Sequence, residues 1–134
     1  MNDIYNTNLD KNNANFTPLS PLSFLKRTAE VYPNKKSIIH GHRKYTWQQT
    51  YERSCQLASA LSSKGIGIGD TVSILAFNTP EIYEAHFGVP MIGAVLNTIN
   101  MRRDVDTISY ILDQGEAKVL LSDNELSPTI KKVL

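Results

Sequence analysis

Two stretches of the chain place apolar residues at the spacing of an amphipathic helix. The first runs from Pro21 to Tyr32 and is stopped by Pro33. The second begins at Thr46, because Thr46 and Gln49 have the Thr-x-x-Gln spacing of a capping box, and Gly65 is placed to end it in a left-handed conformation. One stripe of this second helix is predicted to face the core: Trp47, Tyr51, Ser54, Ala58 and Leu61.

Three short apolar runs further along have the composition of buried strands. Thr71–Phe77 is rich in β-branched residues and apolar nearly throughout, which is typical of a central strand covered on both faces. Ala94–Ile99 and Ala117–Leu121 are the other two. A helix starting at Pro80 separates the first pair, and a helix capped by Asp104 separates the second. The order β-α-β-α-β predicts an α/β fold with a parallel, doubly wound sheet.

The two helices between these runs are patterned differently. Asn78 and Thr79 are candidate caps for the helix that starts at Pro80, and apolar residues surround that helix, which predicts burial on most sides. The helix capped by Asp104 carries its apolar residues on one stripe, and Gly115 is predicted to close it.

The remaining segments are the N-terminal tail, a small hairpin and the last residues of the chain. Residues 1–17 are polar, contain six asparagines and lack apolar periodicity, so we expect a disordered Asn-rich tail followed by one domain over residues 18–134. Ser37–His40 and Arg43–Tyr45 flank a glycine and predict a small hairpin. The last pattern, Leu126–Leu134, begins an amphipathic helix without a stop signal, so we expect the chain to end within a structural element.

Composition argues against several classes of function. Fourteen Lys and Arg against thirteen Asp and Glu give a net charge of +1, which provides no overall field for nucleic acid or an anionic membrane. The single cysteine, Cys55, cannot form an internal disulfide, and we expect a cytoplasmic protein. The chain shows no N-terminal apolar signal region, and its longest apolar run, Phe87–Leu96, is shorter than the roughly 20 residues of a membrane-spanning helix.

Several residues suggest chemistry but have a simpler structural explanation. Gly65–Gly69 contains three glycines, yet it follows a helix and precedes a strand, which reverses the order of a dinucleotide-binding loop. His40 and His42 have no carboxylate or cysteine at a supporting spacing, which favours solvated hairpin histidines over a metal site. We expect His86 to be a buried imidazole bonded to a backbone carbonyl, and Cys55 to be an inert, partly buried thiol.

The loop Met101–Arg103 lies between a predicted strand and the helix capped by Asp104. Its guanidinium groups and the free N–H groups of that helix could meet a phosphate. The alternative is that the arginines are solvated or paired with Asp104 and Asp106. No Ser/His/Asp set or carboxylate pair can be assigned from spacing, so the residues by themselves predict an incomplete α/β lobe without an assigned catalytic site.

Several short segments stand in a fixed order between Tyr45 and Asp123: Tyr45-Thr46-Trp47, Leu57–Leu61, Gly65-Ile66, Gly69–Val72, Asn78–Glu81, Ala85–Pro90, Gly93–Asn100, and Tyr110–Leu112 leading to Ala117–Leu120. Together they resemble the opening region of acyl-CoA synthetases in the adenylate-forming, AMP-binding enzyme family. The segment His86–Asn100 looks most like medium-chain fatty-acid and related acyl-CoA ligases.

This resemblance implies a reaction in which a carboxylic acid and Mg-ATP form an acyl-adenylate and pyrophosphate, and the acyl group then passes to the thiol of coenzyme A with release of AMP. The phosphate loop of the family, its Tyr-Gly-x-Thr-Glu motif and its C-terminal lysine have no match here. We therefore expect no catalytic residue, no tight binding of ATP, Mg or CoA, and no ligase activity in this chain alone.

The resemblance also implies that the loop Asn100-Met101-Arg102 lies near the CoA nucleotide, although the glycines found there in acetyl-CoA synthetases are replaced. The exposed flank of such a lobe predicts poor solubility or association, and a homo-oligomer is one form that the association could take. Two other interpretations stay open: a standalone, non-catalytic α/β module that binds a nucleotide or a protein, and a fragment of an aromatic-acid CoA ligase. A coding sequence that continues past Leu134 into a phosphate loop would support the enzyme.

Overall fold

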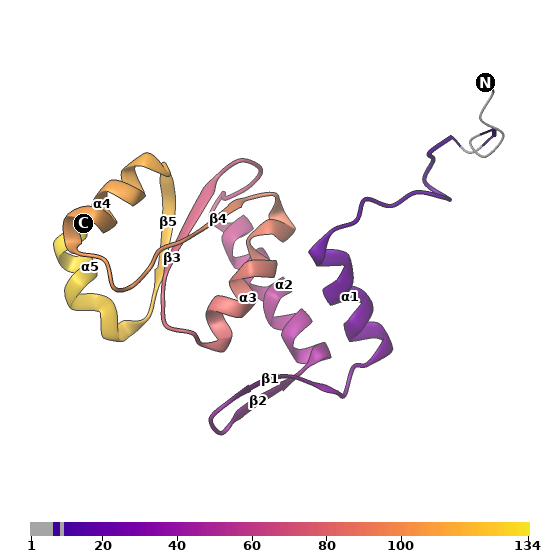
Figure 1. The fold of residues 1–134 in the computed structure, drawn as a ribbon, viewed down its shortest axis with the longest axis horizontal. Helices are drawn as coiled ribbons and strands as arrows, with labels where there is room; N and C mark the ends of the chain where they lie inside the picture. The colour runs from indigo at the N-terminus through magenta and orange to yellow at the C-terminus, as the bar shows by residue number, and fades with distance from the viewer. Residues whose placement is uncertain (1–6, 9) are drawn as a thin grey trace.

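The computed structural model describes residues 7–8 and 10–134, so part of the tail expected over residues 1–17 lies outside the described residues. Figure 1 shows a sheet between two helical layers. One layer contains α2 (Trp47–Ser63) and α3 (Pro80–Gly88), and the other contains α4 (Val105–Gln114) and α5 (Ser127–Val133). The first helix, α1 (Pro21–Val31), packs on α2 at the outer side of its layer.

The sheet consists of three parallel strands in the order β4-β3-β5, which confirms the predicted α/β fold. Its strands are β3 (Thr71–Leu75), β4 (Val95–Thr98) and β5 (Ala117–Ser122). The earliest strand of the three is central and is buried from Val72 to Leu75. Val72 packs with α2 residues on one face, and Leu75 packs with Ile108 of α4 on the other, so β3 contributes to both cores.

Helix α2 forms where its capping signals predict. Thr46 Oγ1 accepts a hydrogen bond from the N–H of Gln49, and the Gln49 side chain accepts one from the N–H of Thr46. At the other end Gly65 has φ +80°, and Ile66 donates its N–H to the carbonyl of Leu61, which completes a Schellman motif. The predicted apolar stripe is slightly wrong, because Trp47 and Tyr51 are only half-buried. The buried residues are Thr50, Ser54, Ala58 and Leu61.

Helix α3 starts at Pro80 as predicted, but Thr79 makes no side-chain capping bond. The prediction of burial on most sides holds in part: Pro80, Glu84, Ala85 and Gly88 are buried and Ile82 and Tyr83 are half-buried, but His86 is exposed. The helix packs closely against α2 at Gly88, where an added Cβ would lie 2.8 Å from the carbonyl oxygen of Ser54. A short 3-10 helix, η1 (Pro90–Ile92), then leads to β4.

Helix α4 begins with Asp104, whose carboxylate accepts the N–H of Thr107 at 2.9 Å, as its capping position predicts. The helix ends at Gly115, as predicted. Gly115 is the last capping residue but has an ordinary right-handed conformation, and Glu116 takes the left-handed one, with φ +47°. A Cβ on Gly115 would lie 3.0 Å from the carbonyl oxygen of Ile111 and 3.1 Å from the side-chain nitrogen of Asn97, so the site is tight for a larger residue.

The outer elements complete the molecule. The strands β1 (Lys36–His40) and β2 (Arg43–Thr46) form the predicted antiparallel hairpin. A 3-10 turn, η2 (Asn124–Leu126), joins β5 to α5, so a helix does form in the last segment of the chain. Among the helices of the described residues, none has the length and hydropathy needed to cross a bilayer.

Candidate functional site

The strand order points to one end of the sheet as the place for a ligand. The chain moves from β3 to β4 on one side, and then passes back to β5 on the other side. In parallel α/β sheets, ligands bind outside the carboxyl ends of the strands, at the position where the order reverses. The loops that follow β3, β4 and β5 therefore form the candidate site.

A cleft of about 630 Å³ lies at this end of the sheet, between the loops that follow β3 and β4. The sequence-predicted residues Asn100, Met101 and Arg102 all line it, and they face the loop that follows β3 across the cleft. The other lining residues are Ala76, Phe77, Asn78, Ile82 and Ile99. The fold thus brings the predicted loop together with a second loop that the sequence interpretation did not include.

The loop Asn100–Arg103 is held by its own hydrogen bonds. The side-chain carbonyl of Asn100 accepts the N–H of Arg102 at 2.9 Å, and the backbone carbonyl of Asn100 accepts the N–H of Arg103 at 3.1 Å. Both arginines are exposed, and neither takes part in an ion pair among the described residues. Their solvated state agrees with one alternative from the sequence.

The N-terminus of α4 is less open to a phosphate than the sequence alone suggests. The Asp104 carboxylate already accepts the N–H and the hydroxyl of Thr107, and these hydrogen bonds lower the pKa of Asp104. A negative charge at the first turn therefore competes with an incoming anion. Of the two donors that the sequence predicted, the guanidinium of Arg102 is the better placed, because it lines the cleft.

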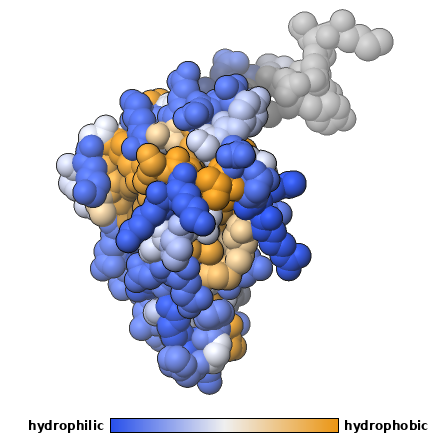
Figure 2. All heavy atoms as spheres, turned by 90° about the vertical axis from the view of Figure 1, so that its left-hand side faces the viewer, coloured by the Kyte–Doolittle hydropathy of each residue, from blue (hydrophilic) through white to orange (hydrophobic). Residues whose placement is uncertain are grey.

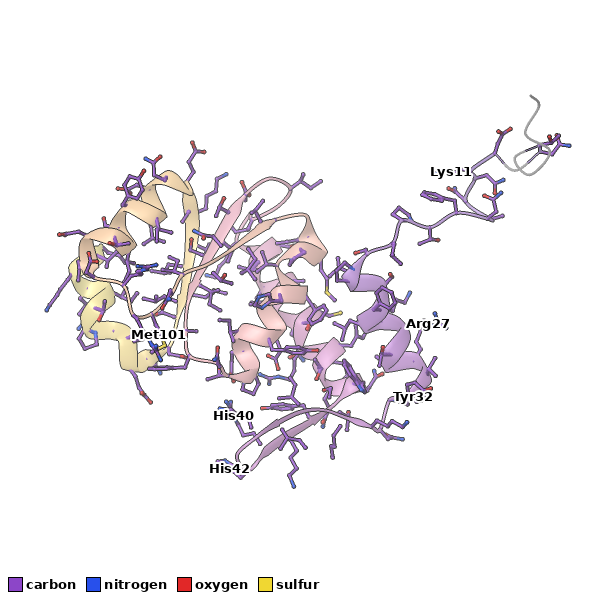
Figure 3. The ribbon with its side chains drawn as sticks, viewed as in Figure 1. Lys11, Arg27, Tyr32, His40, His42 and Met101 are labelled. Atoms are coloured by element: carbon purple, nitrogen blue, oxygen red, sulfur yellow. The ribbon has the colours of Figure 1, made fainter. Side chains whose placement is uncertain are left out.

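Met101 has a structural role in addition to its place in the cleft. Its side chain packs against the core between the sheet and α4, which contains Leu75, Ile99, Ile108 and Leu112. Figure 3 shows Met101 at the end of the sheet and His40 and His42 on the separate hairpin. The Met101 side chain therefore holds the loop Asn100–Arg102 against the core, while the Arg102 side chain is exposed beside the cleft.

Asp123 links the ends of β3 and β5. Its carboxylate accepts the N–H of Phe77 at 2.6 Å, and its own N–H is 3.4 Å from the carbonyl of Leu75. This carboxylate thereby positions the loop that forms one wall of the cleft. Sequence reasoning missed the contact because Phe77 and Asp123 are 46 positions apart.

A second polar group, the Arg–Glu cluster, consists of Arg43, Arg53, Glu81 and Glu84 and joins the hairpin to α2 and α3. Arg53 donates to both oxygens of the buried Glu84, at 2.5 and 3.0 Å, and Arg43 donates to Glu81 at 2.7 Å. Burial raises the pKa of Glu81, but hydrogen bonds from Arg43 and from the backbone outweigh it and lower the pKa to about 2. The sequence did not predict this cluster, because Arg53 and Glu84 lie 31 positions apart and no local pattern links them.

The remaining candidates do not form a site. His40 and His42 are exposed on the hairpin, and no group of three or more His, Cys, Asp or Glu side chains gathers within residues 7–8 and 10–134. His86 bonds the carbonyl of Ile82 at 2.7 Å as expected, but it is exposed instead of buried. Cys55 is a free, half-buried thiol, as expected.

The donors around the cleft suit one part of a nucleotide ligand. Asn78, Asn100 and Arg102 are exposed at its rim, and a guanidinium is a strong partner for phosphate. The floor contains the apolar side chains of Ala76 and Ile99. This combination suits a phosphate group better than a metal ion, which needs several oxygen ligands.

Comparison with known proteins finds CoA ligases similar to this chain. The peroxisomal butyrate–CoA ligase of Arabidopsis thaliana is 54% identical over 121 residues, which cover 90% of this chain and 21% of that protein. The peroxisomal benzoate–CoA ligase of the same plant is 49% identical over 121 residues, with the same two coverages. An anthranilate CoA ligase, solved with anthranoyl-AMP, has a TM-score of 0.83 and 27% identity, covering 87% of this chain and 23% of that one.

The chain spans about a fifth of the length of these relatives. The matches nevertheless cover 90% of this chain for the two plant ligases and 87% for the anthranilate CoA ligase. The model of the family described as AMP-binding enzyme matches residues 25–134. This chain therefore belongs to the AMP-binding enzyme family.

Proposed function

We propose that this chain is the N-terminal α/β lobe of an AMP-forming acyl-CoA ligase, with residues 18–134 as part of the AMP-binding domain and residues 1–17 as a tail. The 54% identity to a butyrate–CoA ligase carries this proposal. In the reaction, the carboxylate of the acid attacks ATP and displaces pyrophosphate. The thiol of CoA then attacks the acyl-adenylate and displaces AMP, and Mg²⁺ would neutralise the phosphate charge.

Within that reaction we assign the residues of this chain to positioning. The loop Asn100–Arg102 would hold the nucleotide end of CoA, with the Arg102 guanidinium donating to a phosphate oxygen. Asn100 fixes the loop through its hydrogen bond to the Arg102 N–H, and Asp123 fixes the opposite wall of the cleft through Phe77. The chain by itself would be inactive, since the phosphate loop and the lysine of the family have no match in it.

A medium-chain fatty acid is our proposed substrate, from the resemblance of His86–Asn100 to ligases of that class. The names of the relatives support short aliphatic acids as well, and a benzoate–CoA ligase of similar identity keeps an aromatic acid as the second candidate. We further propose a cytoplasmic location on the basis of the single free cysteine, although the names of both plant relatives place them in peroxisomes.

A chimeric enzyme tests the proposal. The first fifth of the Arabidopsis butyrate–CoA ligase would be replaced by this chain, and pyrophosphate release and acyl-CoA formation would be measured with butyrate, medium-chain acids and benzoate. We expect the chimera to form acyl-CoA, while the isolated chain releases no pyrophosphate. A folded but inactive chimera, or turnover by the isolated chain, would contradict the proposed function.

The same chimera tests the role of Arg102. We expect Arg102→Ala to raise the KM for CoA by roughly 3- to 10-fold, the loss of about one charge-assisted hydrogen bond, with kcat for pyrophosphate release from the acid and ATP unchanged. Arg103→Ala is the matched control, because Arg103 is equally exposed but does not line the cleft. If the two substitutions change the KM for CoA equally, Arg102 does not bind CoA.

A further inference from the structure

The wall of the cleft opposite Arg102 carries a polar side chain that makes no contact within the fold. Asn78 lines the cleft from the loop that follows β3, and its side chain is exposed. Within residues 7–8 and 10–134 this side chain has no hydrogen-bond partner. Asn100, by contrast, already uses its side-chain carbonyl to accept the N–H of Arg102. The amide of Asn78 is therefore available to a ligand in the cleft.

The backbone around Asn78 forms a tight turn. The N–H of Thr79 donates to the carbonyl of Phe77 at 2.8 Å, which closes a three-residue γ-turn with Asn78 at its centre. Asn78 is not among the described residues with a positive φ, so this is the inverse γ-turn that is common at strand ends. Because the turn contains only three residues, the direction of the Asn78 side chain depends on how Phe77 is held.

Asp123 holds the first residue of this turn. Its carboxylate accepts the N–H of Phe77 at 2.6 Å, and an ionised acceptor makes such a bond stronger than one between neutral groups. The backbone of Asp123 is itself fixed on both sides. Its N–H lies 3.4 Å from the carbonyl of Leu75, and its carbonyl accepts the N–H of Leu126 at 3.0 Å. The carboxylate is thus a firm support for the turn.

The chemistry of the cleft favours an anionic ligand. Asn78 and Arg102 belong to opposite loops, so a phosphate between them would meet an amide donor on one side and a guanidinium on the other. The side of the molecule that carries α4, α5 and β5 is different, since Figure 2 shows hydrophobic atoms gathered near its centre. Asn78 also borders a hollow of about 270 Å³ against the hairpin, but no described arginine or lysine lines that hollow.

We propose that the Asn78 amide donates a hydrogen bond to a phosphate oxygen of CoA, across the cleft from Arg102, and that Asp123 is the positioning residue that orients Asn78. This inference rests on the proposed ligase function and adds a second binding residue to the CoA site. Asp123 does not touch the ligand. It acts through the N–H of Phe77 and the γ-turn that follows.

Substitution of Asn78 in the chimeric ligase tests the binding contact. We expect Asn78→Ala to raise the KM for CoA about fivefold, through the loss of one hydrogen bond to a charged acceptor. The rate of pyrophosphate release from the acid and ATP alone should not change. Asn124→Ala is the matched control, because Asn124 is exposed after β5 and does not line the cleft. A KM for CoA that stays the same in Asn78→Ala would overturn the proposal.

Two substitutions of Asp123 test the positioning role. Asp123→Ala removes the acceptor for the Phe77 N–H, and we expect it to raise the KM for CoA as much as Asn78→Ala does. Asp123→Asn keeps a side-chain oxygen that accepts this N–H, so its KM should stay within about twofold of the unsubstituted chimera. Far-ultraviolet circular dichroism compares the folding of the variants. If Asp123→Asn raises the KM as much as Asp123→Ala, or if both also slow pyrophosphate release, Asp123 does not act in this way.

A double substitution shows whether Asp123 acts through Asn78. We expect Asp123→Ala to have no further effect on the KM for CoA when Asn78→Ala is present, but its full effect when Arg102→Ala is present. If the effects of Asp123→Ala and Asn78→Ala multiply, the two residues act separately and the positioning role is wrong.

The outcomes also separate this inference from the function on which it rests. An inactive chimera would contradict the proposed ligase function. An active chimera in which Arg102→Ala weakens CoA binding and Asn78→Ala does not would contradict the role of Asn78 alone.

Discussion

Glu81 stands where the hairpin, α2 and α3 meet, and it is the described acid with the largest change in pKa. Arg43 lies 2.7 Å from its carboxylate, and Arg53 lies 3.8 Å away. Partial burial raises the pKa of Glu81, but the hydrogen bond and charge of Arg43, together with a backbone hydrogen bond, outweigh it and lower the pKa from 4.5 to about 2. The carboxylate is still 45% exposed, so solvent screening limits its contribution to stability.

The lowered pKa predicts the direction of a pH effect. A carboxyl whose pKa is depressed in the folded state contributes stability above its unfolded pKa, and this contribution is lost as pH falls from about 4.5 to about 2. Urea unfolding between pH 7 and pH 2.5 should show that Glu81→Gln loses part of this pH dependence. Glu125→Gln, at an exposed position outside the described ion pairs, is the control. If the free energy of unfolding of Glu81→Gln depends on pH as strongly as that of the unsubstituted chain, the pKa of Glu81 is not lowered in the folded state.

Glu116 carries a backbone conformation that suits glycine better. Its φ of +47° places a side chain in the left-handed region, which costs an L-residue about 1 kcal/mol or more. We expect Glu116→Gly to raise the free energy of unfolding by about 0.5–1 kcal/mol, because relief of this strain exceeds the added chain entropy. Glu116→Ala, which keeps the Cβ, should not be stabilising. Chemical denaturation of both variants compares them, and equal stability would argue against strain at this position.

At the scale of elements, the contact between α2 and α3 depends on the missing side chain of Gly88. An added Cβ would lie 2.8 Å from the Ser54 carbonyl oxygen and about 3.0 Å from the Leu57 side chain. The first of these atoms belongs to a helical backbone and cannot move by itself. The two helices would have to separate, which would also disturb the Arg53–Glu84 pair between them.

We therefore expect Gly88→Ala to destabilise the chain by about 1–3 kcal/mol, the usual cost of overpacking. The better helix propensity of alanine recovers only a part of this. Thermal or urea unfolding measures the difference. Gly67→Ala provides a matched comparison, because no atom lies within 4 Å of a Cβ there and its φ is not left-handed. If both variants unfold alike, the helices are not in the close contact described.

For the molecule as a whole, the features that the sequence predicted are those encoded within a few residues. The capping box at Thr46, the helix stop at Gly65 and the cap at Asp104 each involve partners at most five positions apart. The left-handed conformation of Glu116 was not predicted, because glutamate carries no signal for it and the stop signal lies at the neighbouring Gly115. In the structure Gly115 ends the helix in a right-handed conformation, close to the carbonyl of Ile111.

The candidate site was only partly predictable. The family resemblance identified the loop Asn100–Arg102, and the structure shows that it lines a cleft. The opposite wall, with Phe77 held by Asp123, depends on pairing between strands that are far apart in sequence. The same holds for Arg53 and Glu84. Charge and spacing along one chain do not determine which distant side chains meet, and only the topology of the sheet does so.

The strand order β4-β3-β5 also bears on how the chain folds while it is being synthesised. The central strand, β3, leaves the ribosome before both of its neighbours. Each later strand can then dock on an edge that already exists, and none has to insert between two strands in place. The sheet thus grows outward in the order of translation, and β5 is the last of the three to be added.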